Sequence, residues 1–152
     1  MKNPNSKEIK LISHRGNVNG KNPNKENSPS YIDAAIKQGY DVEVDVWVEQ
    51  NLIFLGHDMG CYGVDLDWLM ERASNLWLHL KNPEAVIYFM TSDFNYFIHD
   101  KDMATLTSKG HVWVYPGFQP IPGSIAVLPE IYGESVDTNI GICSDYIEMY
   151  SI

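Results

Sequence analysis

Hydrophobic and polar residues alternate strictly along residues 40–49. Valine occupies every second position from 42 to 48, and the positions between and around these valines carry Asp41, Glu43, Asp45, Trp47 and Glu49. A period of two predicts a β-strand with one aliphatic and one polar face. The same pattern predicts strands at 10–14, 76–81 and 111–115, an extended segment at 52–56 after a tight turn, and shorter strands at 96–99, 124–128 and 141–146.

Helical patterns lie between several of these strands. Ser28 and Pro29 are typical of the N-cap and first position of a helix, which Gly39 would end. Asp65 or Asp67 is expected to cap a second helix that runs through 72, and 82–83 (Asn-Pro) to begin a third that runs through 89. The alternation of strands and helices predicts parallel α/β connections.

The polar and aromatic faces of the strands need a shared interior if helices cover the aliphatic faces. This arrangement predicts a TIM-like (β/α) barrel with its chemistry at the carboxyl ends of the strands. A complete barrel usually needs about 250 residues, whereas this chain has 152, and the segments after Tyr115 are too short for full helices. We therefore predict an α/β fold formed by a reduced or incomplete TIM-like barrel, with helices mainly in the N-terminal half. An open doubly wound sheet is the alternative.

Length and composition predict a single domain over residues 1–152. The 11 Lys and Arg residues against 20 Asp and Glu residues give a formal charge of −9, which argues against nucleic acid as a partner. No apolar stretch matches a membrane span or a signal peptide. Cys61 and Cys143 form neither a disulfide framework nor a Cys-x-x-Cys pair. We therefore expect a cytoplasmic protein, whose oligomeric state the sequence leaves open.

Two acidic residues of the valine-rich strand are candidate cation ligands. Glu43 and Asp45 share one face of the strand, about 6.6 Å apart along it, and both can bind a single Mg²⁺ or Ca²⁺. A solvated acidic face is the ordinary alternative for such a pair. Facing positions on neighbouring strands carry Trp77, His79, Lys81 and Trp113. Because this implies enclosure, and enclosed acids need a counter-charge, we favour a cation site.

Histidines end two of the predicted extended segments. His14 is followed by Arg15 and Gly16, and His57 is followed by Asp58. Two histidines that flank an acid pair can act as general base and general acid near neutral pH. Lys81, at the end of the strand at 76–81, can neutralise charge that develops on a phosphoryl group. Each residue taken alone is also consistent with an ordinary solvated position.

In this order, the elements resemble the glycerophosphodiester phosphodiesterase family of the PI-PLC-like phosphodiesterase superfamily. That family carries His-Arg-Gly, then Glu-Asn with Ser or Thr, then Glu-x-Asp, then His-Asp. The corresponding segments here are 14–16, 26–28, 43–45 and 57–58. The match is dense over residues 11–58 and continues thinly through 78–81 and 141–146. Several ordered elements are more specific than one short motif.

The resemblance implies a TIM-barrel fold and metal-dependent cleavage of a small phosphodiester, such as a glycerophosphodiester. His14 and His57 would be the acid/base pair, and Glu43 and Asp45 would hold Mg²⁺ or Ca²⁺. The family typically has a third, acidic ligand at the position that His79 occupies here. Histidine suits Mn²⁺ or Zn²⁺ better than the harder ions. Three outcomes follow: the metal preference shifts, with Mn²⁺ as a possible ion, another acid such as Glu130 or Asp145 takes the place of the ligand, or metal binding is weakened.

The resemblance also implies residues around the phosphate. Arg15 and Lys81 would contact it directly. Glu26, Asn27 and Asp58 would support the site without reacting.

Two functions of different classes follow. The first is a phosphodiester hydrolase, with a phospholipase D-type lyase as a near variant. The second is a non-catalytic module that retains the fold and binds a phosphate ligand. The short chain and the change at His79 favour the module, unless another acid such as Glu130 or Asp145 replaces the missing ligand. Retention of both histidines, the Glu-x-Asp pair and Lys81 favours the enzyme, which we expect.

Overall fold

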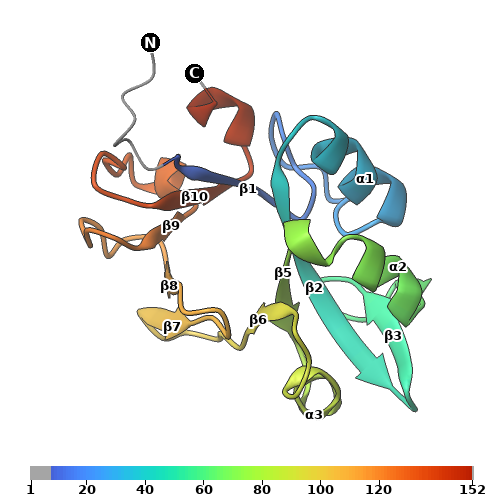
Figure 1. Cartoon of the computed structure of the whole chain (residues 1–152). Helices are drawn as coiled ribbons and strands as arrows, with labels where there is room; N and C mark the ends of the chain where they lie inside the picture. The colour runs from blue at the N-terminus through green and yellow to red at the C-terminus, as the bar shows by residue number, and fades with distance from the viewer. Residues whose placement is uncertain (1–7, 152) are drawn as a thin grey trace.

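The computed structural model describes residues 8–151, whose strands form one ten-stranded sheet that curls round on itself (Figure 1). The strands are β1 (Lys10–His14), β2 (Asp41–Glu49), β3 (Leu52–Leu55), β4 (Tyr62–Val64), β5 (Leu76–Leu80), β6 (Asn95–Phe97), β7 (Ala104–Leu106), β8 (Val112–Val114), β9 (Ile125–Val127) and β10 (Gly141–Ser144). The α-helices are α1 (Pro29–Lys37), α2 (Leu66–Glu71) and α3 (Pro83–Phe89), and short 3₁₀ helices lie at Ala73–Asn75, Pro129–Ile131 and Ile147–Tyr150.

Seven of the strands run parallel, in the spatial order β6-β5-β2-β1-β10-β9-β8. The hairpin β3-β4 extends β2, and β7 pairs antiparallel with β8. The two ends of this parallel series, β6 and β8, are joined only through the turn between β7 and β8 among the hydrogen bonds of residues 8–151. In that turn, Ser108 N donates to Tyr96 O at 2.8 Å, and Tyr96 N donates to Ser108 Oγ at 2.9 Å. No strand ladder joins β6 to β8 within residues 8–151. The sheet is therefore an incomplete barrel, and its order does not reverse as it would in a doubly wound sheet.

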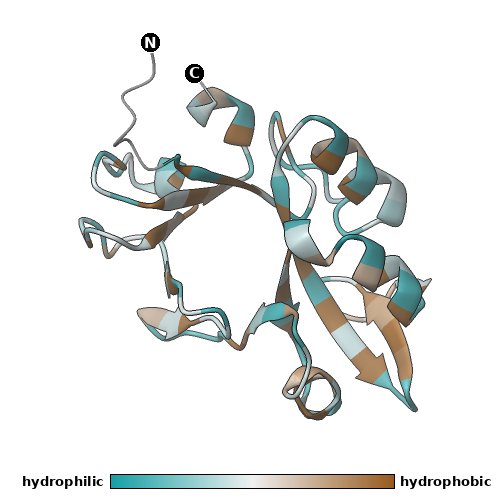
Figure 2. Ribbon diagram, viewed as in Figure 1, coloured by the Kyte–Doolittle hydropathy of each residue, from teal (hydrophilic) through white to brown (hydrophobic). Residues whose placement is uncertain are grey.

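The two faces of β2 belong to two different cores, and Figure 2 shows their alternation as bands of opposite hydropathy along the strand. The valines of β2 pack with Leu76, Leu78 and Leu80 of β5 and with side chains of the helices. The barrel interior is a separate cluster that includes Ile12, Trp77, Phe97, Trp113 and Cys143. Both faces are buried, which explains why polar residues on the inner face need specific partners.

Local signals at the helix starts agree largely with the structure. Asp65 caps α2 by accepting a hydrogen bond from Trp68 N at 2.8 Å, and Asn82 caps α3 by accepting from Ala85 N at 3.1 Å. Ser28 occupies the N-cap of α1 but makes no side-chain capping bond. Several predicted strand ends are wrong by one or two residues, and the prediction missed β4 and β7, two short strands that pair antiparallel with their neighbours. No helix in the described range is long and apolar enough to cross a membrane.

Candidate functional site

The candidate site lies where the carboxyl ends of several strands meet. His14 ends β1, Glu43 and Asp45 lie in β2, and His79 lies in β5. β1, β2 and β5 are neighbours through β2, so sequence segments about 30 residues apart come together. A cavity of about 660 Å³ opens beside them and is lined by His14, Arg15, Lys21, Glu26, Asn27, His57, Asp58 and Asp145 among others.

Glu43, Asp45 and His79 form a cluster that can hold a divalent cation. One ligand atom from each lies within 4.8 Å of the others, and His79 Nδ1 is 3.2 Å from Asp45 Oδ1 and 3.8 Å from Glu43 Oε1. Both carboxylates are buried, and Glu43 Oε2 and Asp45 Oδ1 have no hydrogen-bond partner among the described residues. Because unpartnered buried carboxylate oxygens are costly, the donor set fits a bound cation.

The orientation of His79 suits a metal ligand. Its Nε2 lies 2.9 Å from the main-chain oxygen of His99, which can only accept a hydrogen bond. Nε2 therefore carries a proton, and Nδ1 faces the two carboxylates. A main-chain carbonyl that accepts from the other ring nitrogen and so fixes the tautomer is common for metal-binding histidines. The ring also stacks on Phe97, with centroids 4.9 Å apart.

The two carboxylates differ in their tendency to ionise. Burial, together with the negative charge of Asp45, raises the pKa of Glu43. Burial acts in the same direction on Asp45, but contacts with His57 and His79 and the charge of Arg15 outweigh it and hold the pKa of Asp45 well below its usual range. Asp45 is thus the permanent negative charge of the pair, and Glu43 takes up a proton more readily.

Arg15 connects the acid pair to the second histidine. Its Nε lies 3.1 Å from Asp45 Oδ2, and its Nη2 donates to His57 Nδ1 at 2.7 Å. A guanidinium group only donates, so His57 Nδ1 accepts and the ring proton lies on Nε2. The turn that places Arg15 needs the next residue to be glycine: Gly16 has a φ of 92°, and a Cβ there would lie 2.7 Å from the ring of Tyr31.

His14 is held by an acid from the far end of the chain. Its Nδ1 donates to Asp145 Oδ1 at 2.7 Å, and its Nε2 lies 3.6 Å from Glu43 Oε2. Burial alone would lower the pKa of His14, but the bond to Asp145 and the charge of Glu43 raise it above its ordinary value. Burial would raise the pKa of Asp145, but the interaction with His14 lowers it. The pair is therefore a charge-assisted hydrogen bond.

The loop between β1 and α1 positions two acids of the site, Asp45 and Asp145. Asn27 Nδ2 donates to Asp45 Oδ2 at 2.9 Å, and its Oδ1 accepts from Asp45 N at 3.0 Å. The Nδ2 of Asn17, which is fully buried, donates to Glu26 Oε1 and to Asp145 Oδ1, both at 2.9 Å. Sequence reasoning missed Asn17, because no motif singles it out. It considered Asp145 only as a possible metal ligand, although its place near the carboxyl end of the last predicted strand was a usable signal.

Two of the predicted site residues are less closely involved. The side chain of Lys81 makes no ion pair or hydrogen bond with the site across the described part of the chain, although its main-chain N donates to Val46 O at 2.9 Å. The Asp58 side chain is 91% exposed and lies 3.6 Å from His57 Nε2. Glu130, considered as a substitute ligand, does not belong to the cluster of Glu43, Asp45 and His79. Its Oε1 accepts from Asp145 N at 3.3 Å.

Comparison with known proteins leaves the function to be argued from this geometry. No protein-family model matches the chain, no curated protein matches it, and no solved structure matches it.

Proposed function

We propose that this chain is a divalent-metal-dependent phosphodiester hydrolase of the glycerophosphodiester phosphodiesterase type, built on a reduced TIM-like barrel. One observation supports this most strongly: two histidines flank a pair of buried carboxylates with unpartnered oxygens. The adjoining cavity of about 660 Å³ is of ordinary size for a small ligand. The order of the motifs in the sequence supports the same reaction class.

Glu43, Asp45 and His79 are the proposed metal ligands. When bound, a divalent cation would supply positive charge for a phosphate oxygen. The nitrogen ligand from His79 favours Mn²⁺ over Mg²⁺ or Ca²⁺. Arg15 lines the cavity and is the proposed phosphate contact, whereas the same role for Lys81 rests on the resemblance alone.

The hydrogen bonds assign different tasks to the two histidines. Asp145 accepts from His14 Nδ1, so His14 Nε2 is the atom that can take a proton from an attacking hydroxyl group or water. Arg15 donates to His57 Nδ1, so the proton of the neutral His57 ring lies on Nε2. His57 would act as the general acid in its imidazolium form, with Nδ1 also protonated when Arg15 contacts the phosphate instead, and would then pass the Nε2 proton to the leaving oxygen. The raised pKa of His14 means that Asp145 stabilises the imidazolium formed after proton uptake.

The test is hydrolysis of bis(p-nitrophenyl) phosphate and glycerophosphocholine with Mn²⁺, Mg²⁺, Ca²⁺ or EDTA. We expect metal-dependent turnover, with a loss of at least about 100-fold in His57→Ala and Glu43→Gln. Glu49→Gln is the matched control, because Glu49 lies on the same strand but is exposed. No turnover with any cation, or equal losses in Glu49→Gln, would overturn the proposal.

A phosphate-binding module without catalysis is the second candidate. It is favoured by the contacts of Arg15, which already engages both Asp45 and His57, two groups that a hydrolase needs for its chemistry. Glycerol phosphate that binds with a 1:1 stoichiometry, with no turnover of either diester, would support this alternative.

A further inference from the structure

Large apolar side chains are exposed on the segments that follow the carboxyl ends of β6, β8 and β9. These segments are 98–103, 115–124 and 128–134. Five of their side chains, which we call the apolar rim, are between 44% and 69% exposed: Met103, Tyr115, Phe118, Ile131 and Tyr132. Single exposed apolar residues are ordinary on a protein surface, whereas a group of them at one end of the molecule is typical of an interaction site.

Hydrogen bonds join the three segments of the apolar rim. Tyr115 N donates to Met103 O at 2.9 Å, which ties the segment after β8 to the segment after β6. The carboxylate of Glu134 accepts from the main-chain N of Gly117 at 3.1 Å and of Gln119 at 2.7 Å. These bonds tie the segment after β8 to the segment after β9. The rim residues therefore belong to one connected surface.

Two of these segments also contact the candidate site. The main-chain oxygen of His99 accepts from Nε2 of the proposed metal ligand His79 at 2.9 Å, and the His99 ring lies 5.2 Å from the ring of Tyr115. Leu128 lines the cavity of about 660 Å³ and is followed directly by the 3₁₀ helix Pro129–Ile131. The apolar rim therefore borders the entrance through which a substrate would reach the site.

The segments of the rim carry little positive charge. The segment 115–124 contains no charged residue and has proline at three of its ten positions. The other two segments together contain two Asp, two Glu and one Lys. Because proline restricts the backbone, the apolar side chains of 115–124 are presented at a low cost in conformational freedom. The surface is thus apolar, preorganised and slightly acidic.

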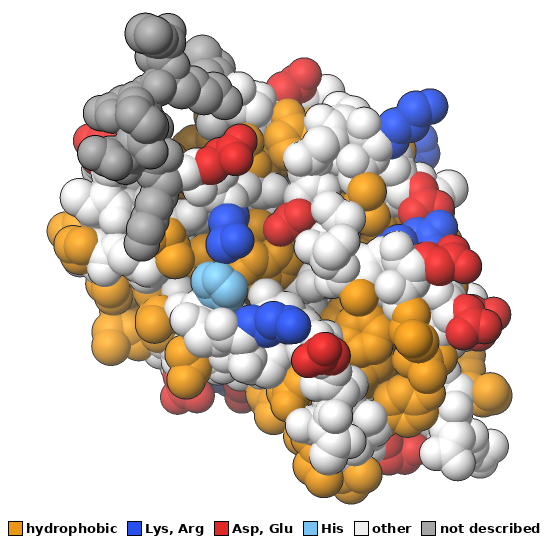
Figure 3. Space-filling model, viewed as in Figure 1, with side chains coloured by type: hydrophobic (Ala, Val, Ile, Leu, Met, Phe, Trp, Pro, Cys, Tyr) orange, Lys and Arg blue, Asp and Glu red, His pale blue; other side chains and the backbone are white. Residues whose placement is uncertain are grey.

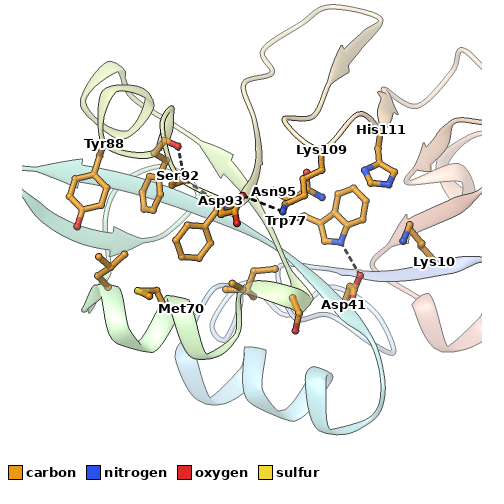
Figure 4. Close-up of a pocket in the computed structure, with 16 residues that line it drawn as sticks. Lys10, Asp41, Met70, Trp77, Tyr88, Ser92, Asp93, Asn95, Lys109 and His111 are labelled. Atoms are coloured by element: carbon orange, nitrogen blue, oxygen red, sulfur yellow. Dashed lines mark hydrogen bonds and ion pairs between the residues drawn. The ribbon is translucent and has the colours of Figure 1, made fainter.

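The amino ends of the strands differ in character. A cavity of about 830 Å³ lies there (Figure 4), and its charged lining is balanced between two lysines and two aspartates, Lys10, Lys109, Asp41 and Asp93. Figure 3 likewise shows basic and acidic side chains intermingled around a histidine in the middle of one face. The weakly charged apolar rim is therefore a feature of the carboxyl ends, where the candidate site opens.

The position of the rim discriminates between kinds of partner. A protein that docks on the rim, including a second copy of this chain, would cover the entrance to the site and hinder access of substrate. A lipid surface would instead bring phosphodiesters to the entrance, because phospholipid headgroups are phosphodiesters. Tyrosine and other aromatic side chains are enriched at the depth of these headgroups. The excess of acidic residues disfavours anionic lipids, which attract basic segments.

We propose that the apolar rim docks this chain on a surface of zwitterionic lipids, with the entrance of the candidate site facing the headgroups. The inference rests on the proposed function, because the argument against a protein partner requires that substrate enters at this end. In this arrangement the rim side chains lie at the boundary between headgroups and acyl chains.

Flotation of the full chain with phosphatidylcholine vesicles tests the proposal. The measurement is made in EDTA, so that neither turnover nor a bound cation affects it. We expect binding that changes by less than about twofold between about 0.1 and 0.5 M NaCl, because salt screens charges and does not weaken apolar burial. Replacing part of the lipid by phosphatidylserine should not strengthen binding.

Variants locate the surface that binds. Phe118→Ser and Ile131→Ser should each weaken partition onto the vesicles about fivefold, since burial of half of a large apolar side chain contributes roughly that factor. Leu106→Ser is the matched control, because Leu106 is 67% exposed but pairs with Val112 at the amino end of β8. It should stay within about twofold of wild type. Circular dichroism establishes that each variant is folded.

The proposal is overturned if the vesicles bind none of the chain, if the higher salt concentration removes the binding, or if Leu106→Ser loses as much as Phe118→Ser. A dimer in solution that Phe118→Ser dissociates would also overturn it and would identify the rim as an interface between two copies. Vesicle binding with the expected pattern among the variants, but without turnover of any diester, would uphold the docking surface and count against the proposed function alone.

Discussion

Replacing Asn27 by glycine should lower the free energy of unfolding by about 2–4 kcal/mol. The side chain makes two buried hydrogen bonds with Asp45, at 2.9 Å to Oδ2 and 3.0 Å from the main-chain N. Leaving the buried N–H without a partner costs about 1–3 kcal/mol, and a bond to a carboxylate contributes about 1.5–3 kcal/mol. Part of the second contribution is retained, because Arg15 Nε stays 3.1 Å from the same oxygen.

Alanine at the same position should destabilise the protein by about 1 kcal/mol more than glycine. Asn27 has a φ of 65°, a left-handed conformation that costs a residue with a Cβ about 1–2 kcal/mol. Asn51 is a matched control, because its φ is 63° but its side chain is exposed and makes no hydrogen bond within residues 8–151. Asn51→Gly should therefore change the stability by less than about 0.5 kcal/mol.

Urea denaturation followed by tryptophan fluorescence measures these differences. The experiment is done in EDTA, since a bound cation would add stabilisation of its own. If Asn27→Gly loses no more stability than Asn51→Gly, the paired hydrogen bonds between Asn27 and Asp45 contribute nothing, and the reasoning is refuted.

Three further predictions concern charged side chains. Asp145→Asn should lower the pKa of His14, because the acceptor loses its charge. With a raised folded pKa, the contribution of His14 to stability is complete below about pH 6.5 and is lost as the pH rises through that pKa. NMR titration of the His14 ring should show the raised pKa in the wild type and a lower pKa in Asp145→Asn. Unfolding at several pH values should show that the wild type loses this contribution to stability as the pH rises, whereas the variant does not. Glu43→Gln should stabilise the metal-free protein by roughly 0.5–2 kcal/mol, since burial disfavours the ionised carboxylate, while abolishing stabilisation by Mn²⁺. Thermal unfolding with and without Mn²⁺ tests this, and a destabilised metal-free variant would contradict it. Arg72→Leu should cost about 1 kcal/mol, because the partly exposed Arg72 donates to both carboxylate oxygens of Asp33 at 2.6 and 3.1 Å. A double-mutant cycle with Asp33→Ala that shows no coupling would contradict this last prediction.

Residues 40–49 illustrate how far the sequence alone leads. Their period of two predicted a strand with separate aliphatic and polar faces, and the structure places the valines in one core and Glu43 and Asp45 toward the barrel interior. The capping residues Asp65 and Asn82 were equally informative, because a cap acts over three or four residues. Patterns that act locally can be seen in a sequence without knowledge of the fold.

The partner of His14 could not be read in the same way. His14 and Asp145 are 131 positions apart, and only the pairing of β1 with β10 brings the two strand ends together. Arg15 shows a related limit: a cation beside a histidine was assigned to the substrate, but in the structure it also neutralises Asp45. The sequence shows which charges are present, whereas their pairing depends on which strands are neighbours.

The strand β2 connects the fold to the proposed chemistry. Its aliphatic face packs under the helices and makes the strand central to the larger core. That packing fixes the opposite face, so Glu43 and Asp45 are held in the interior even though burial raises the pKa of Glu43. Arg15, His14 and His79 offset this unfavourable burial only in part, because two carboxylate oxygens remain unpartnered. A structural core gains nothing from this residual imbalance, whereas a bound cation would remove it, and this difference is the main physical reason to expect a metal at β2.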